Sequence, residues 1–241
     1  EATGYGAMFF LRNMLEQAGS GMDGQRVLIS GSGNVATHAA EKVLQLGGTP
    51  LTLSDSGGFI LADGGLTQEQ IDWVKDLKGL RRGRISEAAD EFGNISFHEG
   101  QRPWGVEADC AAPCATQNEV NGEEAATMLK NGVKAIAEGA NMPCEQAAVD
   151  QFQDARILFG PAKAVNAGGV GVSGLEMSQN SARIAWGEDN LRKLLEDMMK
   201  DIHDACVTHG KDDDGHVNYL KGSNIAGFVK VADAMLAYGH V

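Results

Sequence analysis

Between residues 5 and 165, apolar residues follow two spacings that alternate along the chain. Short continuous apolar runs, typical of buried strands, occur at residues 27–29, 51–54, 95–97, 108–111, 133–137 and 157–159. Helical spacing predicts helices at residues 5–17, 34–46, 67–78, 86–92, 123–131 and 144–152. Because strands and helices alternate, we expect an α/β fold, doubly wound, with a mainly parallel sheet and helices on both faces.

The last third of the chain shows helical spacing only. Residues 167–186, 189–209 and 225–237 each have the pattern of a helix, and no repeat or linker-like stretch interrupts the sequence. A chain of 241 residues that is 43% hydrophobic can bury a sizeable core. We expect a single domain over residues 1–241, with its α/β core at 20–165 and a helical extension at 167–241.

A glycine-rich turn joins the first strand to the helix behind it. Gly31, Gly33 and Ala36 have the spacing G-x-G-x-x-A, the phosphate-binding fingerprint of Rossmann-like dinucleotide-binding folds. Gly31 permits the tight turn, and Gly33 presents no Cβ to an approaching diphosphate. The helix then begins with exposed N–H groups that attract anions. We therefore expect a cofactor site that includes Gly31, Ser32, Gly33, Asn34 and Val35.

The second strand ends at an acidic residue, Asp55, about 20 residues beyond this turn. In many such folds an acid at this place accepts hydrogen bonds from the adenosine ribose. The simpler alternative is a loop glycine cluster followed by a surface aspartate. We favour the dinucleotide site because the order of strand, turn, helix and strand agrees with it.

The charge of the chain is unevenly distributed. A net charge of −13 and a pI near 4.8 argue against nucleic acid as a partner. Four of the 20 basic residues nevertheless lie within seven positions: Lys78, Arg81, Arg82 and Arg84. An acidic protein that binds an anionic cofactor needs a local positive site. The alternative interpretation is a solvated basic face.

Other function classes find little support. No apolar run reaches membrane-spanning length, and residues 1–20 lack the pattern of a signal peptide. No two histidines have metal-binding helical spacing, so we expect no metal site. The four cysteines lack zinc-ribbon or C-x-x-C spacing, which favours buried free thiols and a reducing cytoplasm.

Three further segments follow predicted strands: residues 111–118, 138–143 and 161–170. In open α/β sheets, ligands bind at the carboxyl ends of the strands. The first segment offers backbone and amide groups, among them Gln117, which we include in the cofactor site. In the second, Asn141 can hydrogen-bond a carboxamide through both of its amide atoms. Each segment alone can be a capped turn without a ligand, but three at one sheet edge favour a binding site.

Long literal motifs resemble the glutamate dehydrogenase family. They are residues 1–6 (Glu-Ala-Thr-Gly-Tyr-Gly), 33–36, 113–118, 137–143, 163–170, 174–180 and 224–228. The resemblance runs from the first residue to the last and is strongest to the hexameric NADP-dependent bacterial and fungal enzymes. It implies interconversion of L-glutamate with 2-oxoglutarate and ammonia by hydride transfer to or from a nicotinamide dinucleotide.

The resemblance also implies roles for single residues. Thr3 and Asn34 match cofactor-contacting residues, and Ala115 and Thr116 match positions near the ribose and nicotinamide. Asn141 matches the residue that binds the carboxamide, and Asn166 one near the nicotinamide ribose.

Two residues match the wall that receives the side-chain carboxylate of the substrate, Val170 and Ser173. The hydroxyl of Ser173 can donate to that carboxylate. Its alternative role is a helix serine that bonds back to its own turn.

The chain departs from the family in one respect. The family's catalytic lysine lies in a Gly-Gly-x-Lys-Gly segment of an N-terminal domain, together with an aspartate, and none of the glycine pairs here carries that lysine. We therefore expect the N-terminal substrate domain to be absent and assign no catalytic residue. The chain should bind cofactor without turnover, because hydride transfer needs both halves. The resemblance implies a homohexameric parent enzyme. For the present chain alone, a monomer is an alternative.

The choice of cofactor depends on Asp55 and the basic cluster. A carboxylate about 4 Å from a 2′-phosphate charge costs roughly 4 kcal/mol at a dielectric near 20. Hydrogen bonds from lysine or arginine contribute about 1.5–3 kcal/mol each and offset that cost, particularly if Asp55 turns outward. We therefore favour NADP over NAD, with Ser56, Lys78 and Arg82 at the adenosine end.

Two readings from other classes stay open. One is a stand-alone nicotinamide-nucleotide-binding module with no catalytic role. The other is a methyltransferase, because a glycine-rich turn after the first strand also holds S-adenosylmethionine; the three asparagine-bearing loops argue against it.

Overall fold

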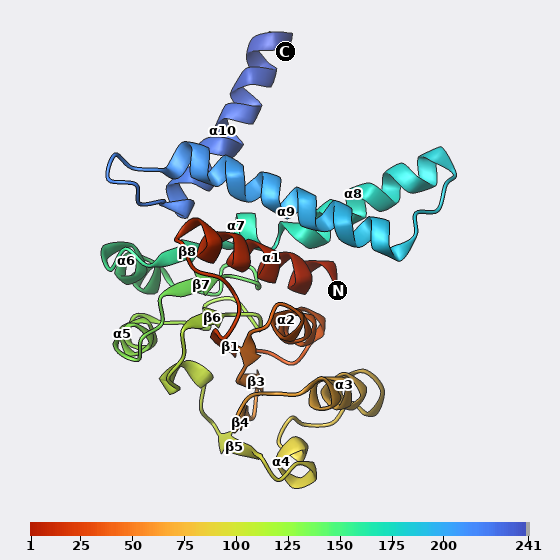
Figure 1. Cartoon of the computed structure of the whole chain (residues 1–241), viewed down its shortest axis with the longest axis vertical. Helices are drawn as coiled ribbons and strands as arrows, with labels where there is room; N and C mark the ends of the chain where they lie inside the picture. Colours follow the sequence, from red (N-terminus) through yellow and green to blue (C-terminus); the bar gives the residue numbers. More distant parts are fainter. Residues whose placement is uncertain (240–241) are drawn as a thin grey trace.

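The computed structural model describes residues 1–239, and its centre is a five-stranded parallel sheet (Figure 1). The strand order is β2-β1-β6-β7-β8. The strands are β1 (Arg26–Ile29), β2 (Thr49–Pro50), β6 (Cys110–Ala112), β7 (Ala135–Ala137) and β8 (Leu158–Gly160). The expected α/β fold with a mainly parallel sheet is confirmed.

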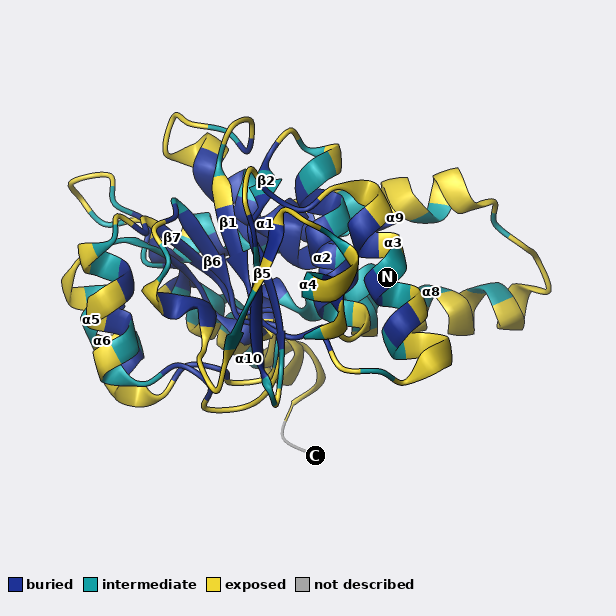
Figure 2. Ribbon diagram, turned by 90° about the horizontal axis from the view of Figure 1, so that it is seen from below, coloured by how far each residue is buried: buried dark blue, intermediate teal, exposed yellow. Residues whose placement is uncertain are grey.

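Helices cover both faces of this sheet (Figures 1 and 2). One face carries α1 (Ala2–Gln17) and α2 (Asn34–Gln45), and the other carries α5 (Gly122–Lys130) and α6 (Gln146–Asp154). The short η2 helix (Pro103–Gly105) packs against α5, and α7 (Ala162–Val165) follows β8.

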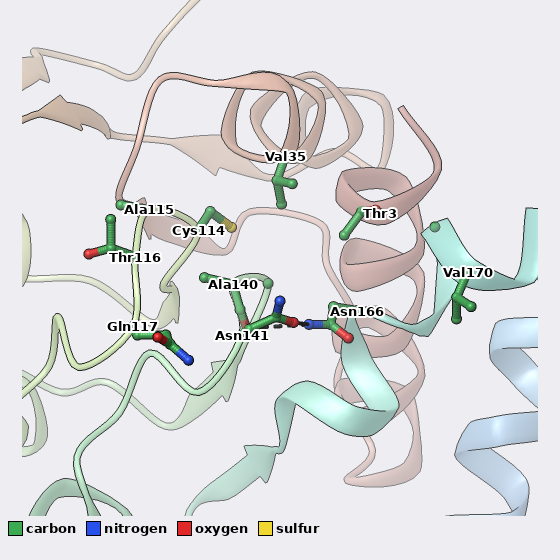
Figure 3. Close-up of a pocket in the computed structure, with 12 residues that line it drawn as sticks. Thr3, Val35, Cys114, Ala115, Thr116, Gln117, Ala140, Asn141, Asn166 and Val170 are labelled. Carbon is green, nitrogen blue, oxygen red and sulfur yellow. Dashed lines mark hydrogen bonds between the residues drawn. The ribbon is translucent and has the colours of Figure 1, made fainter. Parts of the chain in front are cut away.

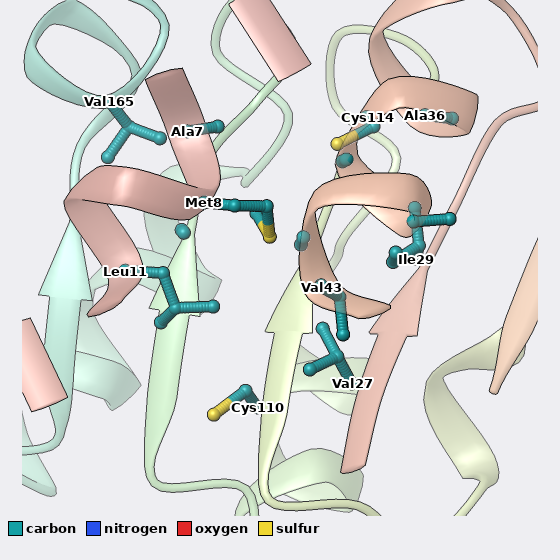
Figure 4. Close-up of a cluster of buried hydrophobic side chains, with 14 of the residues drawn as sticks. Ala7, Met8, Leu11, Val27, Ile29, Ala36, Val43, Cys110, Cys114 and Val165 are labelled. Carbon is teal, nitrogen blue, oxygen red and sulfur yellow. The ribbon is translucent and has the colours of Figure 1, made fainter. Parts of the chain in front are cut away.

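The strands contribute side chains to two hydrophobic clusters, one on each face of the sheet, because successive side chains point to opposite faces. Val27 and Ile29 pack with α1 and α2, whereas Leu28 between them packs with Trp104 and Phe152 on the other face. Figure 4 shows the first cluster, in which side chains of α1 and α2 lie over the strands. The apolar runs that predicted these strands are therefore runs with both faces buried.

A second, three-stranded antiparallel sheet differs from the sequence-based expectation. It has the order β3-β4-β5, with β3 (Thr52–Asp55), β4 (Gly58–Ala62) and β5 (Ile95–Glu99). We expected the run at residues 51–54 to join the parallel sheet and no strand at 58–62. Instead, a tight turn pairs Asp55 with Gly58 and folds the chain back on itself. On this side of β1, the parallel pairing is limited to residues 49–50, and the Leu51 amide adds one hydrogen bond to the Val27 carbonyl.

Local sequence signals explain where several helices begin and end. Thr67 caps α3 (Gln68–Asp76) through a capping box with Gln70, and Asn121 caps α5 in the same way with Glu124. After α3 come the π-helical turn η1 (Leu77–Arg81) and α4 (Glu87–Glu91). The helix expected at 167–186 ends earlier, at Ala182, because Arg183 adopts a left-handed conformation with φ of 54°.

Close helix contact brings the start of the chain to the sheet edge. A Cβ at Gly4 would lie 2.5 Å from the carbonyl oxygen of Val35, so α1 and α2 touch through backbone atoms. This contact places Thr3, at the start of α1, beside the start of α2. The N-terminal segment is thus built into the edge where ligands are expected.

The three C-terminal helices lie beyond α1 (Figure 1). They are α8 (Ala167–Ala182), α9 (Glu188–Gly210) and α10 (Tyr219–Tyr238). α9 packs on α1 and α10, while the far parts of α8 and α10 extend away from the sheet and are largely exposed (Figure 2). Within residues 1–239, no helix combines the length and apolar character needed to cross a bilayer.

The packing of α1 leads to a stability prediction. Leu11, a residue of α1, is fully buried, whereas Leu80 is 81% exposed. Leu11→Ala should lower the free energy of unfolding by about 2–5 kcal/mol, and Leu80→Ala should change it by less than about 0.5 kcal/mol. Urea unfolding followed by circular dichroism measures both. Equal losses for the two variants would contradict the burial of the α1 face.

Candidate functional site

A continuous groove runs along the carboxyl-end edge of the parallel sheet. It consists of two adjoining cavities: the first, of about 700 Å³, lies at the glycine turn and Asp55, and the second, of about 720 Å³, lies at Thr3, Asn141 and Asn166. The same segment of residues borders both cavities: Val35, Cys114, Ala115, Thr116 and Gln117. The groove lies where β1 has β2 on one side and β6 on the other, the point at which the strand order reverses and ligands bind in such sheets.

The glycine turn forms one wall of this groove. Gly31 has φ of +84°, and a Cβ there would lie 2.9 Å from the carbonyl oxygen of Cys114. Its N–H donates to the hydroxyl oxygen of Ser54 over 2.7 Å. A Cβ at Gly33, by contrast, would meet no atom within 4 Å. The first glycine serves the turn, and the second leaves open space in front of α2.

The amino end of α2 carries no side-chain cap. Gly33 is its N-cap residue, whereas side chains of Thr67, Asn121 and Asn218 cap α3, α5 and α10. The first N–H groups of α2 therefore face the groove with the positive end of the helix dipole. Such a helix start is suited to an anion.

The second cavity holds most residues expected near a nicotinamide (Figure 3). The side-chain amide of Asn166 donates to Oδ1 of Asn141 over 2.8 Å. This bond fixes the orientation of both side chains and leaves the Asn141 amide nitrogen free to donate. Thr3, from α1, and Val170, from α8, line the same cavity.

Asp55 does not turn outward. Its carboxylate accepts hydrogen bonds from the Lys78 ammonium (2.9 Å), the Ile85 amide (3.0 Å) and the Gly57 amide (2.9 Å). Burial alone would raise the pKa of Asp55, but these hydrogen bonds outweigh it and hold the pKa below its ordinary value. Asp55 lines the groove, but its negative charge is already balanced by three hydrogen-bond donors of the protein.

The basic cluster divides into residues with different partners. Lys78 pairs with Asp55, and Arg84 donates to the Ser56 hydroxyl over 2.8 Å, beside the first cavity. Arg81 points elsewhere, since it binds Asp76 and stacks over Trp73. Arg82 adopts a left-handed conformation and forms no salt bridge with residues 1–239.

Ser173 lies on the exposed side of α8, one turn beyond the second cavity. Its hydroxyl donates to the carbonyl oxygen of Gly169 over 3.1 Å, which is the back-bonded arrangement that we considered as its alternative role. To donate to a ligand, this hydroxyl must leave that bond.

Two charged groove residues were missing from the sequence-based prediction, Arg102 and Glu119. Arg102 donates to the backbone carbonyl of Glu119 over 2.9 Å, so its guanidinium spans the groove rim and the loop behind it. Arg102 lies in a stretch without periodicity and gave no local signal. Glu119 directly follows the segment 111–118, and a charged residue at the end of a predicted strand-edge loop was the available clue.

The described part of the chain holds neither a metal-binding cluster nor a disulfide. Among residues 1–239, no three His, Cys, Asp or Glu side chains converge on a point that would hold a metal ion. All four cysteines, Cys110, Cys114, Cys144 and Cys206, are buried free thiols.

Comparison with protein families identifies the class. The model of the Glutamate/Leucine/Phenylalanine/Valine dehydrogenase family matches residues 1–239. The chain belongs to this family of dehydrogenases. This assignment argues against the methyltransferase alternative.

Individual relatives are glutamate dehydrogenases. The NAD(P)-specific enzyme of Xylanibacter ruminicola is 52% identical over 99% of this chain, and the NADP-specific enzyme of Escherichia coli is 50% identical over 99%. The NAD-specific enzyme of Bacteroides fragilis is 45% identical. The chain spans about half the length of these relatives, 53–54%. The resemblance to glutamate dehydrogenase is confirmed.

Solved structures agree with the sequence relatives. A Plasmodium falciparum glutamate dehydrogenase superposes with a TM-score of 0.96 at 38% identity and covers all of this chain with 52% of its own. The enzyme of Peptoniphilus asaccharolyticus shares the fold, with a TM-score of 0.78 at 20% identity.

The Asp55 network leads to a pH-dependent prediction. Asp55→Asn removes the charge that Lys78 and the Ile85 amide bind, so it should cost about 1–3 kcal/mol at pH 7. A carboxylate with a lowered pKa stabilises the fold above its ordinary pKa, 3.8, and loses this effect as pH falls through the lowered value. Urea unfolding at descending pH should show the gap between wild type and variant shrinking below pH 3.8. A gap that widens on acidification would contradict the network.

Proposed function

We propose that this chain is the cofactor-binding part of a glutamate dehydrogenase and binds NADP in the groove at the sheet edge. The observation that carries the proposal is the uncapped amino end of α2, which opens onto a groove long enough to be divided into two cavities. A helix start without its own cap is suited to a diphosphate, and the cavities on either side leave room for two nucleosides.

The groove residues fit a nicotinamide dinucleotide. The N–H groups of Asn34 and Val35 would hold the diphosphate, and the Asn141–Asn166 pair would orient the carboxamide end. Bound there, the cofactor supplies hydride transfer. The residues themselves bind, orient and exclude water, and we assign none of them a catalytic role.

Charge at the adenosine end favours NADP over NAD. The negative charge of Asp55 is balanced by the Lys78 ammonium and by backbone amides, so its repulsion of a 2′-phosphate is reduced. Arg84 and Ser56 lie together beside the cavity and supply donors for a phosphate. Relatives bear both NADP-specific and NAD-specific names, so this choice depends on the side chains.

The full reaction requires a second part. The relatives are nearly twice as long as this chain, and α8 and α10 expose an apolar surface away from the sheet: Met177, Phe228, Val231, Met235, Leu236 and Tyr238. Exposed apolar surface of this extent marks an interaction site. We propose that the remaining half of the enzyme packs here and contributes catalytic groups, with Val170 and Ser173 facing the substrate.

The same proposal covers assembly and location. We propose a homohexamer for the complete enzyme, no turnover for this chain alone, and the cytoplasm as its compartment, which the four free thiols support. The alternative is a stand-alone nicotinamide-nucleotide-binding module.

Cofactor choice is tested by a matched pair of arginine variants. Arg84→Ala removes a donor beside Ser56 and should weaken NADPH binding about 10- to 100-fold while NADH affinity stays within about twofold. Arg81→Ala, whose side chain is bound to Asp76 and Trp73, should change neither affinity. Fluorescence titration with both nucleotides measures this. Equal losses for NADPH and NADH in Arg84→Ala would oppose the assignment of NADP.

Completion by a second half separates the enzyme part from a stand-alone module. The purified chain should produce no NADPH from glutamate and NADP. Turnover should appear when this chain is co-expressed with the N-terminal half of a relative such as the Escherichia coli enzyme. NADPH formation by the chain alone would refute the first expectation. A stable complex without turnover would favour the stand-alone module.

A further inference from the structure

Glu119 is an internal carboxylate at the floor of the groove. Its side chain is 7% exposed, and it borders the cavity assigned to the adenosine and diphosphate. Its Oε1 accepts hydrogen bonds from the amides of Ala115 (2.9 Å) and Thr116 (3.3 Å). These two residues border both cavities, so the carboxylate holds the segment that joins the two halves of the groove.

Ser30 holds a third amide of the same loop. Its hydroxyl oxygen accepts a hydrogen bond from the Cys114 amide over 2.9 Å. Three consecutive N–H groups are thus satisfied, that of Cys114 by Ser30 and those of Ala115 and Thr116 by Glu119. The loop after β6 is tied to the end of β1, which carries the glycine turn.

The backbone of Glu119 is held from the opposite side. Its carbonyl oxygen accepts hydrogen bonds from the Arg102 guanidinium (2.9 Å) and the Trp104 indole (3.3 Å). Burial raises the pKa of Glu119, and the hydrogen bonds from the two amides oppose that rise. A buried carboxylate is costly unless donors satisfy it, and here the donors are the groove's own backbone.

We infer that Glu119 is a positioning residue for the dinucleotide: its carboxylate occupies the Ala115 and Thr116 amides and fixes the loop between the two cavities. Free N–H groups attract anions. With these two amides occupied, the N–H groups at the start of α2 become the favoured seat for the diphosphate. The inference rests on the proposed function, since it concerns how the same cofactor is held.

The test is a chemical rescue measured by NADPH titration. Glu119→Ala removes both acceptors and should weaken NADPH binding at least about tenfold. Formate should restore part of the affinity of Glu119→Ala by filling the vacated place, whereas chloride at equal ionic strength should not. Glu119→Gln keeps the Oε1 acceptor and should stay within about threefold of wild type.

Asp109→Ala is the matched control. Asp109 precedes β6 at the opposite end of the strand, where its carboxylate accepts from the amide and guanidinium of Arg26. Its loss should lower stability without changing NADPH affinity or responding to formate. If Glu119→Ala and Asp109→Ala both lose NADPH affinity in proportion to their loss of folding stability, Glu119 has only a general structural role. That result would overturn the inference.

The remaining outcomes are also decisive. If Glu119→Ala binds NADPH as tightly as wild type, the inference is wrong. If Glu119→Ala does not fold, Glu119→Asp replaces it: the shorter side chain draws the oxygen away from the amides and should bind NADPH less tightly than Glu119→Gln. Affinity equal to or above that of Glu119→Gln would overturn the inference. Failure of wild type itself to bind NADPH would refute the proposed function instead.

Discussion

The structure depends on the close approach of two strand ends, those of β1 and β6. Gly31 lies against the carbonyl oxygen of Cys114 and adopts a left-handed conformation, so the turn after β1 requires glycine on both grounds. That turn aims α2 along the sheet edge and leaves its first N–H groups without a side-chain cap. The same approach brings Ser30 beside the loop after β6. The groove and the uncapped helix start at its wall both follow from this single contact.

Much of this arrangement could be predicted because the signals are local. The apolar run at 27–29, the glycine spacing and the helical stripe behind it each follow from a few neighbouring residues. The loops at 111–118, 138–143 and 161–170 could be placed at one edge because parallel strands share their carboxyl ends. The structure brings most of the expected residues to the borders of one groove.

What could not be predicted depends on contacts between distant segments. The hairpin of β3 and β4 is set by pairing with β5, whose residues follow more than 30 positions later. The inward orientation of Asp55 depends on Lys78 and on the Ile85 amide, which no spacing rule connects to it. Glu119 is similar, because its backbone is held by Arg102 and Trp104, which precede it by 17 and 15 positions.

The central claim is that backbone N–H groups at the start of α2 seat the diphosphate of a dinucleotide. Backbone amide NMR of the chain during titration with NADPH tests it most directly. The account predicts that the amide resonances of Asn34, Val35 and Ala36 shift and saturate together with those of Ala115 and Thr116. Saturable binding that leaves the three α2 amides unmoved would contradict it.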